Sequence, residues 1–346
     1  MARAGVEIDL LLPIADQTIV GPVAAELGLQ CDVRCFPMDG EDEREALADL
    51  RRYLTDNRPS AVLTNRDRAT AVLARVPRDQ RPFTVSRVGT NIDARLAGKH
   101  LLRRWSAKRE LVRSLMGVDA LVGVSDGVCQ ALERLLGDGL APPIERIYNP
   151  IDAEAFARLA ATPPAHPWLT SKKTPVVLSV GRLVRAKDYP TLIRAFRLVR
   201  NKLDCRLIVL GEGRQRARLQ RLVDRLGLAG CVDLPGHAAN PFAYMARADL
   251  LALSSIFEGN PNVLVEALAV GTACVATDCP SGPSETLADG RYGRLVPPRD
   301  PPALAAAILE GLERPPDPRL LREAIQRFDR DAAVAAYLRV LRLVSP

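Results

Sequence analysis

The sequence predicts an α/β protein made of two similar units, each with a parallel sheet and crossover helices. Short β-branched apolar runs alternate with amphipathic runs of helical period along all 346 residues. A segment rich in proline and small residues, at 161–167, separates two such halves. The length suits two domains that each bury a core of their own. We therefore expect an N-terminal domain over residues 1–165 and a C-terminal domain over residues 166–328.

The expected elements follow in order along the chain. Apolar runs in the first half predict strands at 7–12, 61–64, 84–88, 120–124 and 146–148. Amphipathic patterns between them predict helices at 43–57, 68–75, 101–115 and 126–136. The second half has predicted strands at 176–180, 206–210, 232–234, 250–253, 274–276 and 293–295. A last helix is predicted over 331–344, after a proline-rich stretch.

The composition is that of an ordinary globular protein, with 47% hydrophobic and 26% charged residues. No apolar run reaches the roughly 18–20 residues that a membrane helix needs. The N-terminus lacks the apolar core of a signal peptide, so we expect a cytoplasmic protein. Seven scattered cysteines form no C-x-x-C pair, and three histidines have no metal spacing. We therefore expect no metal ion and no other cofactor.

The net charge of +7 would suit nucleic acid, a membrane surface or a phosphorylated ligand. Aromatic residues make up only 4% of the chain, and there is no Lys-rich or Gly/Arg-rich tract. A stacking platform for single-stranded nucleic acid is therefore not expected. The charge also fits a solvated surface, because it is spread as arginine over amphipathic helices.

Two carboxylates separated by seven residues form the most informative motif. Glu258 lies in a turn of glycine, asparagine and proline, and Glu266 lies on an apolar helix that begins near Pro261. Predicted strands at 250–253 and 274–276 flank the motif, which puts its loop at the C-terminal edge of a parallel sheet, where such sheets bind ligands. Backbone N–H groups at a helix start attract phosphate. Carboxylates beside an anion site indicate a ligand with hydroxyls and phosphates, such as a nucleotide-sugar.

Cations follow the first strand of the second half. Gly181 makes a tight turn, and Arg182 and Lys187 come after it. Arginine can grip a diphosphate with two hydrogen bonds, and lysine adds a point charge. Such cations would stabilise the negative charge that builds on a departing nucleoside diphosphate. Taken alone, these residues also fit ordinary surface charge on a strand–helix loop.

The next two strand ends carry weaker signals. A G-x-G turn at Gly211, Glu212 and Gly213 ends one strand, although many strand–helix loops need such a backbone. His237 and Asn240 follow the next strand, where the loop could contact a base through its backbone. By itself, His237 fits a loop residue better than a catalyst.

These motifs fall in a fixed order: S-V-G-R-L at 179–183, L-G-E-G at 210–213, L-P-G at 234–236, E-G-N-P-N-V-L-V-E-A-L-A at 258–269 and T-D-C-P-S-G-P-S-E at 277–285. The chain closely resembles the retaining family-4 glycosyltransferases of the GT-B fold, most specifically over residues 176–297. The resemblance implies two Rossmann-like domains facing across a cleft, with a C-terminal helix at 329–346 packing back on the first. It also implies transfer of a hexose or N-acetylhexosamine from a nucleotide-sugar, UDP-linked in our expectation, to a glycan or lipid-linked acceptor. The implied setting is surface polysaccharide or lipopolysaccharide biosynthesis.

The resemblance also implies roles for individual residues. Arg182 and Lys187 would clamp the donor diphosphate without a metal. Glu258 would face the donor sugar, and Glu266 would bind the ribose hydroxyls. The turn and helix start between the two carboxylates would add further donor contacts, from Gly259, Asn260, Asn262 and Val263.

The first half departs from the family pattern. Residues 1–12 look like the end of a first helix running into a second strand, so a first strand and its glycine-rich loop are expected to be missing. The usual acceptor-side histidine is not found either. Asp67 and Asn91 occupy the corresponding strand ends and are our acceptor-side candidates, although each could equally cap a helix.

Residues 99–113 form a basic amphipathic segment with Trp105 among cations. Such a helix can lie on an anionic membrane surface, here the inner face of the cell membrane, or can be a solvated helix face. Two other functions stay open: a nucleotide-sugar-binding protein that has lost turnover, and an epimerase. The epimerase is disfavoured because neither Glu258 nor Glu266 has a histidine nearby in the sequence.

Overall fold

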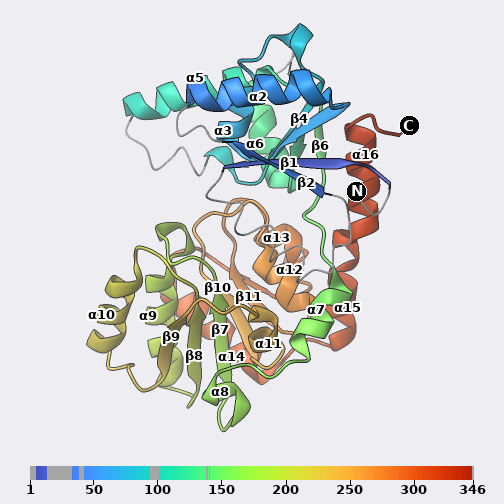
Figure 1. Ribbon diagram of the computed structural model, residues 1–346. Coiled ribbons are helices and arrows are strands. Elements are labelled where there is room, and N and C mark those ends of the chain that lie inside the picture. Colours follow the sequence, from blue (N-terminus) through green and yellow to red (C-terminus); the bar gives the residue numbers. More distant parts are fainter. Residues whose placement is uncertain are drawn as a thin grey trace.

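The computed structural model describes residues 5–13, 33–38, 43–93, 101–137, 139 and 141–344. The chain forms two α/β units that lie against each other, each built on parallel strands covered by helices (Figure 1). We call the unit that contains strands β1–β6 the N-domain and the unit that contains β7–β12 the C-domain. The α/β class with parallel sheets in both halves is as predicted.

The N-domain strands form two parallel sheets. One contains β1 (Ile8–Pro13) and β2 (Val33–Met38). The other has the order β3-β4-β5-β6 and contains β3 (Ala61–Thr64), β4 (Phe83–Val88), β5 (Ala120–Gly123) and β6 (Ile144–Arg146). The sequence did not predict β2, because Pro37 interrupts a short apolar run and proline is rare inside strands. The last strand also lies two residues earlier than predicted.

The predicted N-domain helices are present as α2 (Glu43–Asn57), α3 (Asp67–Leu73), α5 (Leu101–Met116) and α6 (Asp126–Leu136). Helices α5 and α6 bury one apolar stripe against the four-stranded sheet, where Leu115, Leu121 and Leu132 share one core. The C-terminal helix α16 (Arg330–Val340) covers the other face, with Tyr337 packed among strand residues such as Val122. The end of the chain therefore completes the core of the N-domain.

The C-domain contains a six-stranded parallel sheet in the order β12-β11-β10-β7-β8-β9. Its strands are β7 (Val176–Val180), β8 (Arg206–Leu210), β9 (Val232–Gly236), β10 (Leu250–Leu253), β11 (Cys274–Thr277) and β12 (Arg294–Val296). All six lie where the sequence predicts them. Strands β7, β8, β10 and β11 are buried on both faces, which explains why they have continuous apolar runs, whereas the edge strand β9 alternates.

Helices cover the two faces of this sheet as separate sets. One face packs on α9 (Tyr189–Arg200), α10 (Arg216–Arg225) and α14 (Pro301–Glu313). The other packs on α11 (Pro241–Met245), α12 (Asn262–Ala269) and α15 (Pro318–Ala324). Successive strand residues alternate between the cores: Val177 joins the first, and Val176 and Leu178 join the second.

The strand order creates a crevice between β7 and β10. From β7 the chain continues to β8 on one side, and it later returns to place β10 on the other side. The loops after β7 and β10 therefore leave the sheet in opposite directions, which is where open α/β sheets bind ligands. The motifs with Arg182, Lys187, Glu258 and Glu266 follow these two strands.

Two chain crossings between the domains lie side by side. The first follows β6 and leads into α7 (Ala153–Ala160), and the second leads into α16. The Ile151 N–H donates to the Phe328 carbonyl at 3.0 Å, and Arg330 pairs with Asp152 at 2.7 Å. Helix α7, which the predicted division at residue 165 puts in the N-terminal domain, stacks Phe156 on Phe242 of α11 in the C-domain.

Candidate functional site

The loops after β7 and β10 bring together the predicted cation and the first carboxylate. Lys187 Nζ lies 2.6 Å from Glu258 Oε1, and the two side chains are 20% and 13% exposed. The Ser255 hydroxyl also donates to Glu258 Oε1, at 2.6 Å. The Ser254 hydroxyl donates to the Lys187 carbonyl at 2.8 Å, so the two loops are held together. Glu258 is thus an oriented carboxylate with a charged partner.

Glu266 completes this cluster from the middle of α12. Burial raises the pKa of its carboxyl, and the positive charge of Lys187 acts in the opposite direction. Glu266 is therefore within electrostatic reach of the same lysine that binds Glu258. Sequence spacing alone predicted the pair of carboxylates; in the structure Lys187 pairs with Glu258 and acts on Glu266 through its charge.

The start of α12 has polar groups that remain available to a ligand. The helix begins at Asn262 and not at Pro261 as predicted, and no side chain caps its first turn. Uncapped N–H groups at a helix start attract anions. The Asn260 side-chain nitrogen is buried without a hydrogen-bond partner, which is rare in a folded protein. Val263 lies in the first turn, and its side chain is buried.

The strand-end glycines let the loops approach one another closely. Gly211 has a φ of +137°, and a Cβ there would lie 2.1 Å from the Gly181 carbonyl oxygen. Gly213 similarly approaches the Leu183 backbone. The G-x-G turn thus places the β8 loop against the loop with Arg182, which is exposed at the end of β7.

The remaining predicted donor residues have mixed surroundings. The Glu212 carboxylate pairs with Arg216 at 2.8 Å and is exposed. His237 is exposed after β9. Asn240 caps α11 and donates to the Leu159 carbonyl of α7 at 2.8 Å and to the Thr162 hydroxyl, in the linker, at 2.7 Å. The amide of Asn240 is thus engaged in structural contacts.

The two acceptor-side candidates differ in their connection to the cluster. Asn91 is buried and donates to the Ser281 hydroxyl across the domain boundary at 3.3 Å. Ser281 in turn donates to the Glu258 carbonyl at 2.8 Å. Asp67 is the first residue of α3, beyond β3 in the N-domain. Asn91 is therefore connected to the Glu258 turn through one serine.

Arg87 is a residue near the domain boundary that the sequence did not indicate. It lies near the end of β4 and donates to Asn65 at 2.5 Å and to Asn149. The Asn149 amide donates to Asn262 Oδ1 at 2.6 Å, at the start of α12. A chain of polar contacts thus runs from the N-domain sheet to the donor-side helix. The sequence offers one sign of this role: Arg87 is a charged residue near the end of an apolar strand, two positions before Gly89.

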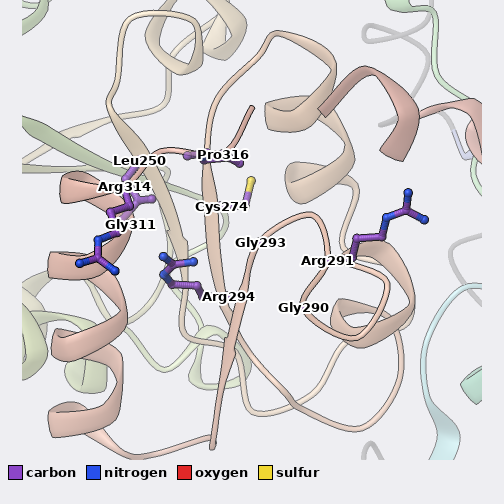
Figure 2. A pocket seen from close by; sticks show the side chains of 10 residues that line it. Leu250, Cys274, Gly290, Arg291, Gly293, Arg294, Gly311, Arg314 and Pro316 are labelled. Atoms are coloured by element: carbon purple, nitrogen blue, oxygen red, sulfur yellow. The ribbon is translucent and has the colours of Figure 1, made fainter. Parts of the chain in front are cut away.

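A small cavity of about 60 Å³ lies at the N-terminal ends of the C-domain strands, opposite to the strand ends that carry the predicted donor residues (Figure 2). It is lined by the first residues of three strands, Leu250, Cys274 and Arg294, and by Arg314 after α14. Arg294 pairs with Glu310 at 2.8 Å. The predicted donor residues follow the C-terminal ends of the strands, so this cavity is separate from them.

Within the described part of the chain, no group of three or more His, Cys, Asp or Glu side chains is arranged to hold a metal ion. Nor does any helix there combine the length and apolarity needed to span a membrane.

Comparison with known proteins finds a family model that matches the C-domain. Residues 174–314 match the family model described as Glycosyl transferases group 1. This segment contains every predicted donor residue. The match also spans the ordered motifs from Gly181 to Glu285.

Curated relatives match about half of the chain. A Campylobacter jejuni protein, "N-acetylgalactosamine-N,N'-diacetylbacillosaminyl-diphospho-undecaprenol 4-alpha-N-acetylgalactosaminyltransferase", is 41% identical over 152 residues, covering 44% of this chain and 40% of that protein. The lipopolysaccharide core biosynthesis glycosyltransferase LpsE of Rhizobium meliloti is 33% identical over 177 residues, covering 50% and 51%. The matches thus span about half of these relatives or less.

Solved structures match over nearly the whole chain. Anabaena HepE in complex with UDP has a TM-score of 0.77 and 21% identity, covering 96% of this chain and 92% of that one. The lipopolysaccharide outer core galactosyltransferase WaaB has a TM-score of 0.70 and 17% identity, covering 98% and 99%. At these identities the likeness shows the fold, which is the two-domain GT-B fold implied by the resemblance.

Proposed function

We propose that the protein is a retaining glycosyltransferase that moves a hexose or N-acetylhexosamine from a UDP-sugar to a glycan or lipid-linked acceptor. The observation that carries the proposal is the ion pair of Lys187 with Glu258 at the crevice of a domain that matches Glycosyl transferases group 1, with Glu266 under the electrostatic influence of the same lysine. A UDP donor is supported by the fold shared with HepE, whose structures contain UDP and UDP-glucose. The setting of surface polysaccharide or lipopolysaccharide synthesis is supported by the names of the relatives.

In the proposed donor complex, the diphosphate lies between Arg182, Lys187 and the uncapped start of α12. These groups stabilise the negative charge that develops when the bond between the sugar C1 and the phosphate oxygen breaks. Glu266 accepts hydrogen bonds from the ribose hydroxyls. Glu258 faces the donor sugar and is oriented by Ser255. The remaining donor contacts are backbone groups at the strand ends and around Asn260.

Retention follows if the acceptor hydroxyl attacks C1 from the face that the diphosphate leaves. The new bond joins the acceptor oxygen to C1, and the proton of the hydroxyl passes to the departing phosphate oxygen. Asn91 and Asp67 remain our acceptor-side candidates. Since two cations and a helix start surround the diphosphate, we propose that turnover needs no metal ion.

We further propose that α5 docks on anionic lipid at the inner face of the cell membrane. Trp105 is 60% exposed, and the Arg109 guanidinium lies 4.6 Å from the centre of its ring. Arg104, Lys108 and Arg109 are exposed beside it, while Leu111 and Leu115 face the core. An exposed tryptophan among cations is typical of helices that bind a membrane interface.

The test of the proposed activity is UDP release from a panel of UDP-hexoses and UDP-N-acetylhexosamines, with lipid-diphosphate-linked and soluble glycan acceptors. We expect acceptor-dependent release with one donor and an α-linked product from an α-linked donor by NMR. The Glu258→Gln variant should bind UDP but not turn over. A wild-type protein that binds UDP and releases none would support the nucleotide-sugar-binding protein instead. An inverted product would contradict the retaining mechanism.

A further inference from the structure

Glu285 joins the C-domain to the first turn of an N-domain helix. It lies in α13 (Pro283–Thr286), which follows β11. Its two carboxylate oxygens accept hydrogen bonds from the backbone N–H groups of Asp126 at 2.7 Å and Gly127 at 2.9 Å. These residues begin α6, a helix of 11 residues. A carboxylate at a helix N-terminus is stabilised by both the free N–H groups and the helix dipole.

The residue that caps α6 makes a second contact across the boundary. The Ser125 hydroxyl accepts from the Val128 N–H and donates to the Gly259 carbonyl at 2.8 Å. Gly259 directly follows Glu258 and also forms an antiparallel bridge with Thr90. The same helix start that binds Glu285 therefore holds the backbone beside Glu258.

Two glycines allow the domains to approach this closely. A Cβ on Gly127 would lie 2.4 Å from the Ser281 Cβ. A Cβ on Gly259 would lie 2.2 Å from the Gly89 carbonyl oxygen. A larger residue at either position would force the backbone at this boundary to shift, because real Cβ atoms do not make contacts this short.

We infer that Glu285 is a positioning residue, which fixes the closed arrangement of the two domains and thereby the place of Glu258. The inference rests on the proposed function only in assigning Glu258 to the donor sugar. When the domains part, the carboxylate and the N–H groups of Asp126 and Gly127 return to water. Losing the contact between Glu285 and the start of α6 should therefore loosen the two domains while each domain keeps its own fold.

Small-angle X-ray scattering with saturating UDP tests the inference independently of turnover. We expect the radius of gyration to increase from wild type through Glu285→Gln to Glu285→Ala, because glutamine keeps one acceptor oxygen and alanine keeps none. Gly127→Ala should expand the protein as well. The control is Glu323→Gln, which removes a surface carboxylate paired with Arg291 within the C-domain.

Kinetics test the positioning role. Losing charge-assisted hydrogen bonds should lower kcat roughly tenfold for Glu285→Ala, while UDP affinity by calorimetry stays within about twofold of wild type. Circular dichroism and thermal unfolding identify variants that fail to fold, in which case Glu285→Gln carries the test. The inference is overturned if folded Glu285→Ala has the same radius of gyration as wild type, whether both proteins are compact or both are expanded. If wild type transfers no sugar, the scattering result still decides about Glu285, and only the proposed function fails.

Discussion

Lys187 Nζ and Glu258 Oε1 lie 2.6 Å apart, although the two residues are 71 positions apart along the chain. The pair joins the loop after β7 to the loop after β10, across the crevice of the C-domain sheet. Lys187 is thus held in place by its ion pair with Glu258 in the ligand-free protein, and its charge also acts on Glu266. A preorganised charge of this kind loses little free energy to reorganisation when a diphosphate binds.

We expect Lys187→Ala to lower kcat roughly 100- to 1000-fold, the usual loss when one preorganised charge-stabilising group is removed. Steady-state kinetics with the identified donor measure it. The matched control is Arg185→Ala, which removes an exposed cation from the same turn, η3 (Arg185–Lys187). Equal losses in the two variants would contradict a specific role for Lys187.

Glu266→Ala should weaken UDP binding. A hydrogen bond from ribose to a charged acceptor contributes about 1.5–3 kcal/mol, which corresponds to roughly 10- to 150-fold in Kd. Isothermal titration calorimetry measures the change, and thermal unfolding confirms that the variant is folded. The ribose role is wrong if a folded variant binds UDP as tightly as wild type.

Glu266→Gln should stabilise the ligand-free protein at neutral and higher pH. Burial raises the pKa of Glu266 in the folded state, so the folded protein holds this proton more tightly than the unfolded chain does. Above the folded pKa the buried charge therefore lowers the free energy of unfolding by the full amount. This penalty shrinks as the pH falls from the folded towards the unfolded pKa, and it is absent below the unfolded pKa. Melting temperatures of wild type and variant should differ at pH 8 and converge at acid pH. A difference that does not change with pH would indicate a cause other than ionisation.

Transfer should be insensitive to EDTA, because Arg182, Lys187 and the start of α12 surround the proposed diphosphate position. The measurement is the initial rate in EDTA and after addition of Mn²⁺ or Mg²⁺. Loss of activity in EDTA that Mn²⁺ restores would show that the cations do not suffice.

Replacing Arg104, Lys108 and Arg109 by Gln should release the protein from anionic vesicles. Each cation near such a surface contributes about 1 kcal/mol, and the effect fades with salt. Co-sedimentation with phosphatidylglycerol vesicles at low and high salt measures it. The control replaces the exposed Arg218, Arg221 and Arg225 of α10, with the same change in charge. Equal binding of both variants, or no binding by wild type, would mean that α5 is an ordinary solvated face.

Local pattern predicted most of the architecture. Every strand of the C-domain sheet was visible in the sequence, because buried parallel strands are short β-branched runs. The E-x7-E spacing and the glycine turns indicated a nucleotide-sugar site, since their chemistry lies within single loops. Strand β2 was not predicted, because a proline and an arginine interrupt its short apolar run.

Only the tertiary structure decided what meets across the domain boundary. The contact of Glu285 with the start of α6 joins residues 159 positions apart, and the contacts of Arg87 span three separate elements. Asn240 donates to Leu159 of α7 and to Thr162 of the linker, and α7 packs on the C-domain. The periodicity of the sequence predicts none of these contacts. The physical reason is that residue spacing encodes a helix face or a strand end, whereas a pairing between two domains depends on the shapes of both.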